Sequence, residues 1–159
     1  MNYIEVERFI QENAEDDDFT GGISDEDILE IEKMLNVKLP ESYKWFLRKY
    51  GSGGIYGVDI LGLGKVGPPQ VVSVTYDYRK YYGLIDGIIV IEYIDEFSYC
   101  LDTNKMKDGE CPVILWDNLE GYGRTVADNF LDFFLENLKE SKENWEDDEE
   151  DWDDDEDLD

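Results

Sequence analysis

Residues 37–54 read VKLPESYKWFLRKYGSGG and mark the start, the buried face and the end of one helix. Pro40 suits the first turn of a helix, where its missing N–H would have had no partner, and Gly51 suits the left-handed position that closes a helix. Between them, large apolar side chains recur at helical spacing. This stripe consists of Leu39, Tyr43, Phe46, Leu47 and Tyr50. The pattern predicts a short helix that buries the stripe.

Trp45 lies on the same predicted helix, away from the stripe and beside Glu41 and Arg48. A tryptophan in this position is either covered by another element or exposed as part of a contact surface. Because tryptophan is highly buried on average, we expect Trp45 to be covered.

Two further helices are predicted before this one. The apolar spacing over residues 3–10 indicates a first short helix, which the acids and glycines of residues 15–22 end. Ser24 then suits the N-cap of a second helix, and the three acids that follow it face the positive end of the helix dipole. The inward stripe of this second helix consists of Ile28, Ile31 and Leu35. Only a short connection separates it from the helix after Pro40, so the two should be in contact.

These elements carry a resemblance. The chain has an acidic helix ending in Glu32 and Leu35, then Leu39-Pro40, then Tyr43, Phe46 and Leu47, then a glycine-rich turn. In this order it resembles the SUKH superfamily of bacterial immunity proteins and eukaryotic cell-wall regulators, more loosely as far as the helix near Phe130. The resemblance implies an α+β fold and a protein that acts mainly by binding other proteins. Bacterial members often neutralise a toxin encoded beside them, and no catalytic residue comes with the match.

Short apolar runs follow the glycine-rich turn and predict strands at Val58–Leu61, Ile88–Ile94, Tyr99–Leu101 and Val113–Trp116. The last three can pair as successive antiparallel strands, with a hairpin loop at Asn104–Gly109.

Residues 71–82 alternate like a strand but also fit a helical stripe, and periodicity alone does not decide between the two. The helical stripe uses more of the apolar residues, and the resemblance implies a helix, so we predict a helix.

The last predicted helix follows a turn at Asn118–Gly123 and is capped by Thr125. Its apolar residues cover about half of its circumference, so it should lie against the sheet. They are Val126, Ala127, Phe130, Leu131, Phe134, Leu135 and Leu138. The sequence therefore predicts one α+β domain over residues 1–142, with a central antiparallel sheet packed against N-terminal helices and a long C-terminal helix.

Acidic residues dominate the composition, with 41 Asp and Glu against 14 Lys and Arg and a formal net charge of −27. Residues 143–159 hold 13 acids and no base, which leaves 28 acids against 14 bases, a charge of −14, for residues 1–142. We expect the acidic tail to be disordered. Such a field repels nucleic acid and anionic membranes and attracts basic proteins. No apolar run reaches the ~20 residues of a membrane span, and no signal peptide begins the chain, so we expect a cytoplasmic protein.

Catalytic and metal-binding patterns are weak in this sequence. Histidine is absent, and Cys100 and Cys111 have no further ligand to complete a zinc site, so both are expected to be reduced thiols. A calcium loop starting at Asp102 fails because Lys107 stands where glycine is needed and Val113 where glutamate is needed. We therefore expect no enzymatic activity, no cofactor and no specific metal.

Together, the charge and the resemblance predict an immunity protein that occludes the basic active-site surface of a cognate toxin. A nuclease is the favoured toxin class, because it must present lysine and arginine to its substrate. The candidate partner-binding residues are acids in loops bordering the sheet: Asp95, Glu96, Asp117 and Glu120. The alternative is an intracellular scaffold or a regulatory module that binds peptides.

Overall fold

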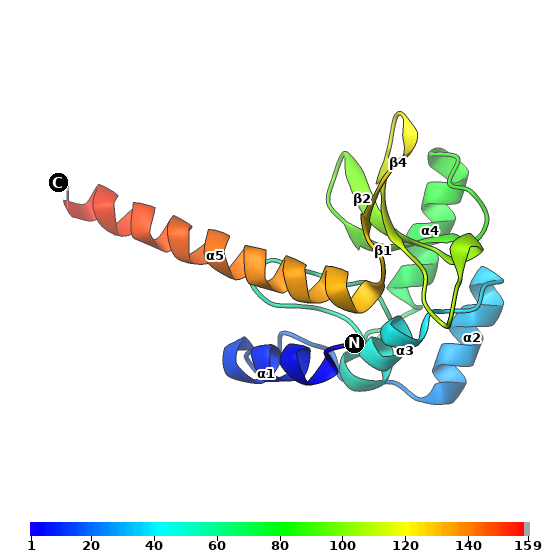
Figure 1. The fold of residues 1–159 in the computed structure, drawn as a ribbon, viewed down its shortest axis with the longest axis horizontal. Coiled ribbons are helices and arrows are strands. Elements are labelled where there is room, and N and C mark those ends of the chain that lie inside the picture. Colours follow the sequence, from blue (N-terminus) through cyan, green and yellow to red (C-terminus); the bar gives the residue numbers. More distant parts are fainter. Residues whose placement is uncertain (158–159) are drawn as a thin grey trace.

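The computed structural model describes residues 1–157, and the side chains of residues 1–147. This part of the chain forms one α+β domain with five α-helices and a four-stranded antiparallel sheet (Figure 1), which confirms the predicted fold class. In chain order the elements are α1 (Tyr3–Asn13), α2 (Asp25–Leu35), α3 (Glu41–Tyr50), α4 (Gln70–Tyr81), β1 (Ile88–Tyr93), β2 (Phe97–Asp102), a short 3-10 helix (Thr103–Lys105), β3 (Val113–Asp117), β4 (Gly121–Ala127) and α5 (Phe130–Asp157).

The helix expected from residues 37–54 is α3, and its C-terminal signal is confirmed. Gly51 follows the helix with φ 74°, and a Cβ at this position would lie 2.0 Å from the carbonyl oxygen of Gly21. Pro40, however, is the N-cap and not a residue of the first turn. Proline has no side-chain acceptor, so the cap comes from Glu110, whose carboxylate accepts hydrogen bonds from the Ser42 N–H at 2.9 Å and the Ser42 hydroxyl at 2.5 Å.

The core lies where α3 meets the first turns of α5. Phe46 and Phe134 have ring centroids 5.2 Å apart, and Tyr43 and Phe130 lie 5.3 Å apart in an edge arrangement. All four side chains are fully buried. Trp45, on the far side of α3, is partly buried beneath α1, with its ring 4.9 Å from that of Tyr3, so the predicted cover is confirmed.

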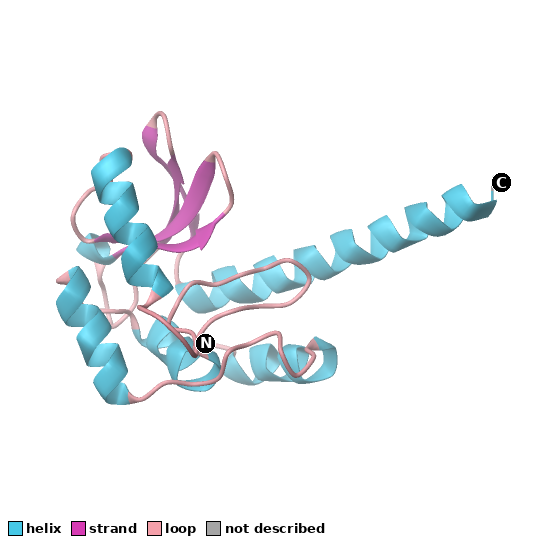
Figure 2. Ribbon diagram, turned by 180° about the vertical axis from the view of Figure 1, so that it is seen from behind, coloured by secondary structure: helices cyan, strands magenta, loops and turns pink. Residues whose placement is uncertain are grey.

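The sheet has the strand order β1-β2-β3-β4, and helices lie on both of its faces. Ser98 and Tyr99 are neighbours on β2 and therefore point to opposite faces. The Ser98 hydroxyl shares a hydrogen bond of 2.5 Å with the Tyr78 hydroxyl of α4, and the Tyr99 ring lies 5.0 Å from Phe133 of α5. Figure 2 shows the strands rising between these two helices. The helical interpretation of residues 71–82 is thus confirmed.

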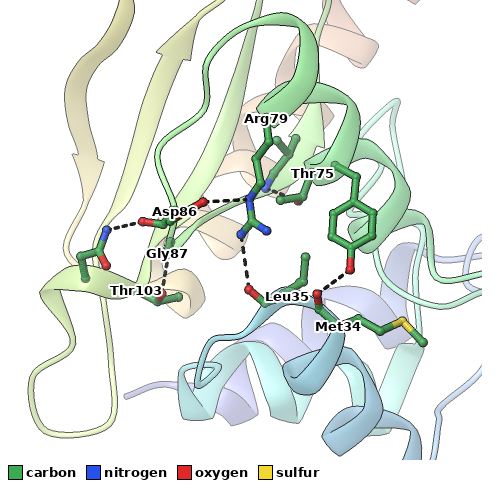
Figure 3. Close-up of polar contacts among 10 residues, drawn as sticks. Met34, Leu35, Thr75, Arg79, Asp86, Gly87 and Thr103 are labelled. Carbon is green, nitrogen blue, oxygen red and sulfur yellow. Dashed lines mark hydrogen bonds and ion pairs between the residues drawn. The ribbon is translucent and has the colours of Figure 1, made fainter.

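A single junction joins α2, α4 and the start of β1 (Figure 3). Arg79 of α4 donates to the carbonyl oxygen of Leu35 at the end of α2, at 3.4 Å, and its Nε lies 4.0 Å from the Asp86 carboxylate. The hydroxyl of Thr103 donates to the carbonyl oxygen of Gly87. These contacts hold the end of the sheet that lies opposite the β1–β2 and β3–β4 turns.

The strand predicted at Val58–Leu61 is wrong. The segment lies along the free edge of β1, but there Leu61 N–H donates to the Ile91 carbonyl at 2.7 Å while Asp59 N–H donates to the side chain of Glu92 at 3.2 Å. Because a side chain takes the place of the next backbone acceptor, the ladder does not continue. The segment covers the edge without joining the sheet.

The turn predicted at Asn118–Gly123 is present but spans only Asn118–Glu120, and the cap predicted at Thr125 is wrong. Strand β4 begins at Gly121, and Thr125 pairs with Ile114 of β3. The helix starts at Phe130 and is capped by Asn129, whose side chain accepts from Asp132 N–H at 2.9 Å. An exposed, glycine-containing edge strand carries little hydrophobic alternation, which explains the error.

The predicted boundary between residues 142 and 143 falls inside α5, which continues to Asp157. Near this boundary the Lys142 ammonium lies 5.9 Å from the Phe9 ring centroid. The Trp145 ring, with the residue 50% exposed, lies 6.1 Å from that of Tyr56. α5 projects from the body (Figure 1), and residues 158–159 of the predicted tail lie outside the described residues. The expectation that this segment is dispensable for folding stays a prediction.

Candidate protein-binding surface

The four predicted binding residues come from two hairpin turns. Asp95 and Glu96 lie between β1 and β2, while Asp117 ends β3 and Glu120 lies before β4. Strands β2 and β3 are antiparallel, and Phe97 pairs with Asp117, so both turns lie at the same end of the sheet. We call this region the hairpin end. The structure therefore brings all four predicted acids to one end of the molecule.

Asn118 holds the two turns together. Its backbone N–H donates to the carbonyl oxygen of Glu96 at 3.0 Å, and its side-chain amide donates to the carbonyl oxygen of Asp95 at 2.8 Å. Because both bonds reach across from one hairpin to the other, the hairpin end is one connected surface.

Asp117 has a different role from the other three acids. Its carboxylate accepts hydrogen bonds from the backbone N–H groups of Glu120 at 2.9 Å and Leu119 at 2.8 Å. These two bonds, that from Glu120 first, hold the pKa of Asp117 below its ordinary value. Asp117 thus builds the β3–β4 turn, whereas Asp95, Glu96 and Glu120 are exposed and available to a partner.

Exposed apolar side chains at the hairpin end were not predicted from the sequence. Leu119 is 96% exposed, and Tyr93 and Ile94 are exposed beside the first turn. Ile94 and Leu119 stand in hairpin turns, where polar residues are usual, and this contrast was the available signal. Aromatic and aliphatic side chains that a polar rim surrounds are typical of protein interfaces.

Glu92 is a buried carboxyl group with a raised pKa, the kind of group that often belongs to an active site. Desolvation raises its pKa to about 7. Two hydrogen bonds act in the opposite direction, one from Asp59 N–H at 3.2 Å and one from the Asn137 amide at 2.7 Å. The residue is only 4% exposed, and each oxygen is held by one of these bonds. Its position suits a structural link and gives no access to a substrate.

The two cysteines are buried and free. Burial raises the pKa of both thiols, to about 12 for Cys111, where nearby Glu110 and Asp102 add to the effect. A thiol with so high a pKa supplies almost no thiolate near neutral pH. Among the residues that the structure describes, no group of three or more His, Cys, Asp or Glu side chains is placed to hold a metal ion.

None of the helices over the described residues combines the length and the apolar character that a membrane crossing requires.

Comparison with known proteins supports the fold and identifies the family. A 103-residue stretch is 27% identical to the uncharacterized protein YnaB of Bacillus subtilis (strain 168), covering 64% of this chain and 65% of that protein. A crystal structure of a protein from Pseudomonas syringae pv. tomato has a TM-score of 0.56 at 19% identity, covering 76% of this chain and 89% of the other. The SUKH_5 family, described as SMI1-KNR4 cell-wall, matches residues 6–139. The chain therefore belongs to this family of the SUKH superfamily, as its helix and turn motifs predict.

Proposed function

We propose that this protein neutralises a cognate bacterial toxin by binding the basic surface around the toxin's active site. A nuclease is the favoured toxin class. The observation that carries the proposal is the hairpin end, where the exposed acids Asp95, Glu96 and Glu120 and the exposed Leu119 lie in two turns that Asn118 links. The resemblance to bacterial immunity proteins and the formal charge of −27 support it.

The mechanism is occlusion. Acids at the hairpin end take the positions that substrate phosphates would take on a basic toxin, and Tyr93, Ile94 and Leu119 supply the apolar contact that excludes water. A nuclease acts where its nucleic acid is, so the proposal places the encounter in the cytoplasm. Occlusion needs no catalysis by this protein, and both of its thiols are buried.

Charge reversal tests the proposal. The variant carries Asp95→Lys, Glu96→Lys and Glu120→Lys, and it spares Asp117 because that residue builds the turn. It is expected to lose protection of cells that express the toxin encoded by the neighbouring gene. The matched control reverses three exposed acids elsewhere, Glu12, Glu30 and Asp77, and should keep protection.

Full protection by the folded hairpin variant would exclude this end as the interface. Binding to a protein of the cell's own, with none to the neighbouring gene product, would favour the alternative function of an intracellular scaffold or peptide-binding module.

A further inference from the structure

The face of the sheet opposite α4 is only partly covered. A hollow of about 440 Å³ lies between this face and α5. Tyr99, Arg124 and Val126 line it from the sheet, and Phe133 and Glu136 line it from the helix. We call this hollow the α5 groove.

Aromatic rings connect the α5 groove to the hairpin end. The Phe97 and Tyr99 rings lie 5.5 Å apart in an edge arrangement, and Tyr99 lies 5.0 Å from Phe133. Phe97 and Tyr99 are only partly buried, so part of each ring faces solvent. Because Phe97 pairs with Asp117, this aromatic ladder begins at the hairpin end and leads down to α5.

The helix wall of the groove is acidic. Carboxylates line the hollow at four-residue intervals: Asp132, Glu136 and Glu140 on α5, with Asp128 just before the helix. Like charges at this spacing destabilise a helix by a few tenths of a kcal/mol per pair. Arg124 is the one cationic residue that lines the hollow, and it makes no ion pair among the described side chains, so most of the acids lack an internal partner.

We propose that the α5 groove and the aromatic ladder hold an extended, arginine- or lysine-rich segment of the partner protein. The cations stack on the exposed faces of Tyr99 and Phe97, while Glu136 and Glu140 neutralise their charge from the helix side. This rests on the proposed function, because it takes the partner to be a basic protein, and it extends the interface from the hairpin end onto the sheet. Nucleic acid and a second copy of this chain, itself at −27, are both repelled by the same wall.

Fluorescence anisotropy with a labelled ten-residue peptide of alternating arginine and glycine tests the groove. One variant carries Phe97→Leu and Tyr99→Leu, which keep apolar contact with Phe133 but remove the ring faces. It should weaken peptide binding about threefold to fivefold. A second variant carries Glu136→Gln and Glu140→Gln and should weaken binding by a similar factor.

The matched control is Glu26→Gln with Glu30→Gln, two exposed acids with the same four-residue spacing on α2. This control loses the same charge, so any change in its peptide affinity reflects the overall electrostatic field of the protein alone. We expect that change to be below about twofold. Amide NMR shifts caused by the peptide should map to β2, β4 and the first turns of α5. A peptide of alternating glutamate and glycine should cause none.

Equal weakening in the groove variants and in the α2 control would overturn the inference, as would peptide-induced shifts confined to other elements. A dimer of the wild-type protein that the groove variants abolish would also overturn it, in favour of a second copy as the occupant. The toxin assay separates this failure from failure of the function. If groove variants protect fully while the hairpin variant does not, the groove inference fails and the proposed function stands. If wild-type protein neither binds nor protects against the neighbouring toxin, the function fails whatever the peptides show.

Discussion

The carboxylate of Glu92 on β1 accepts a hydrogen bond of 2.7 Å from the side-chain amide of Asn137 on α5. Its second oxygen accepts from Asp59 N–H in the segment that covers the edge of β1. One buried carboxyl group therefore links the sheet, the edge segment and the C-terminal helix.

This link makes the stability depend on pH. The pKa of Glu92 is raised to about 7 in the folded protein, from an ordinary value of 4.5, so the folded state binds the proton more tightly than the unfolded state. The free energy of unfolding should thus fall as pH rises from about 4.5 to about 7, by up to ~3 kcal/mol from this group. Urea unfolding across that range measures it.

Glu92→Gln isolates the contribution of the carboxyl group. The amide can accept from Asp59 N–H and, after rotation of the Asn137 amide, donate to Asn137. This variant should be more stable than wild type at pH 8 and show a flatter pH profile. Glu12→Gln, on an exposed site, should keep the wild-type slope. Parallel slopes for wild type and Glu92→Gln would refute the assignment.

The cap between Glu110 and Ser42 joins residues 68 positions apart in the chain. Glu110→Ala should lower the free energy of unfolding by about 1–2 kcal/mol, because it leaves the buried N–H and hydroxyl of Ser42 without their acceptor. A double-mutant cycle with Ser42→Ala measures the coupling, and the two losses should be less than additive. Additive losses would show that the cap contributes nothing.

Removal of residues 143–159 should leave cooperative unfolding intact, since that segment holds 13 acids and little apolar surface. The structure adds one expected cost, about 0.5–1.5 kcal/mol for the contact of Trp145 with Tyr56. Removal of residues 147–159 keeps Trp145 and should cost less. Loss of cooperative unfolding in the longer truncation alone would place Trp145 in the folding unit.

Association with the toxin should be fast at low salt and slow by about tenfold or more between 50 and 500 mM, as the Debye length shrinks from roughly 14 to 4 Å. The dissociation rate should change less, and stopped-flow measurements give both rates. The hairpin-end reversal variant should show a shallower salt dependence than its matched control. Salt-insensitive binding of wild type would exclude charge mimicry and leave an apolar interface through Tyr93, Ile94 and Leu119.

Features that depend on neighbouring residues could be predicted from the sequence, and features that depend on distant contacts could not. Gly51 and Ser24 have their predicted roles because helix ends depend on neighbouring backbone groups. The Glu110 cap and the edge segment at Leu61 depend on contacts between distant parts of the chain, and no short-range pattern carries them. Strand β4 was missed because its exposed, bulged sequence alternates weakly.

The candidate surface shows the same division. Asp95, Glu96 and Glu120 were expected in loops bordering the sheet. The structure brings them to one end, because successive antiparallel strands place alternate turns at the same end. That Asp117 is occupied in its own turn depends on the backbone conformation of that turn. That Phe97 and Tyr99 stay partly exposed depends on how far α5 covers the sheet. The apolar pattern of α5 does not predict the direction in which the helix leaves the sheet.

The direction of α5 also sets the distance at which electrostatic attraction to a partner begins. Beyond Leu138, the last buried side chain described in α5, 19 of its 28 residues remain, about 28 Å of helix. This exceeds three Debye lengths at physiological ionic strength, roughly 8 Å each. Acidic charges on the projecting part of α5 can therefore attract a cation at a distance from the body where the same charges, spread over the body, would be screened by salt. Under the proposed function, the capture distance for the basic toxin is therefore set by helix length, and one heptad more or less would move it by about 10 Å.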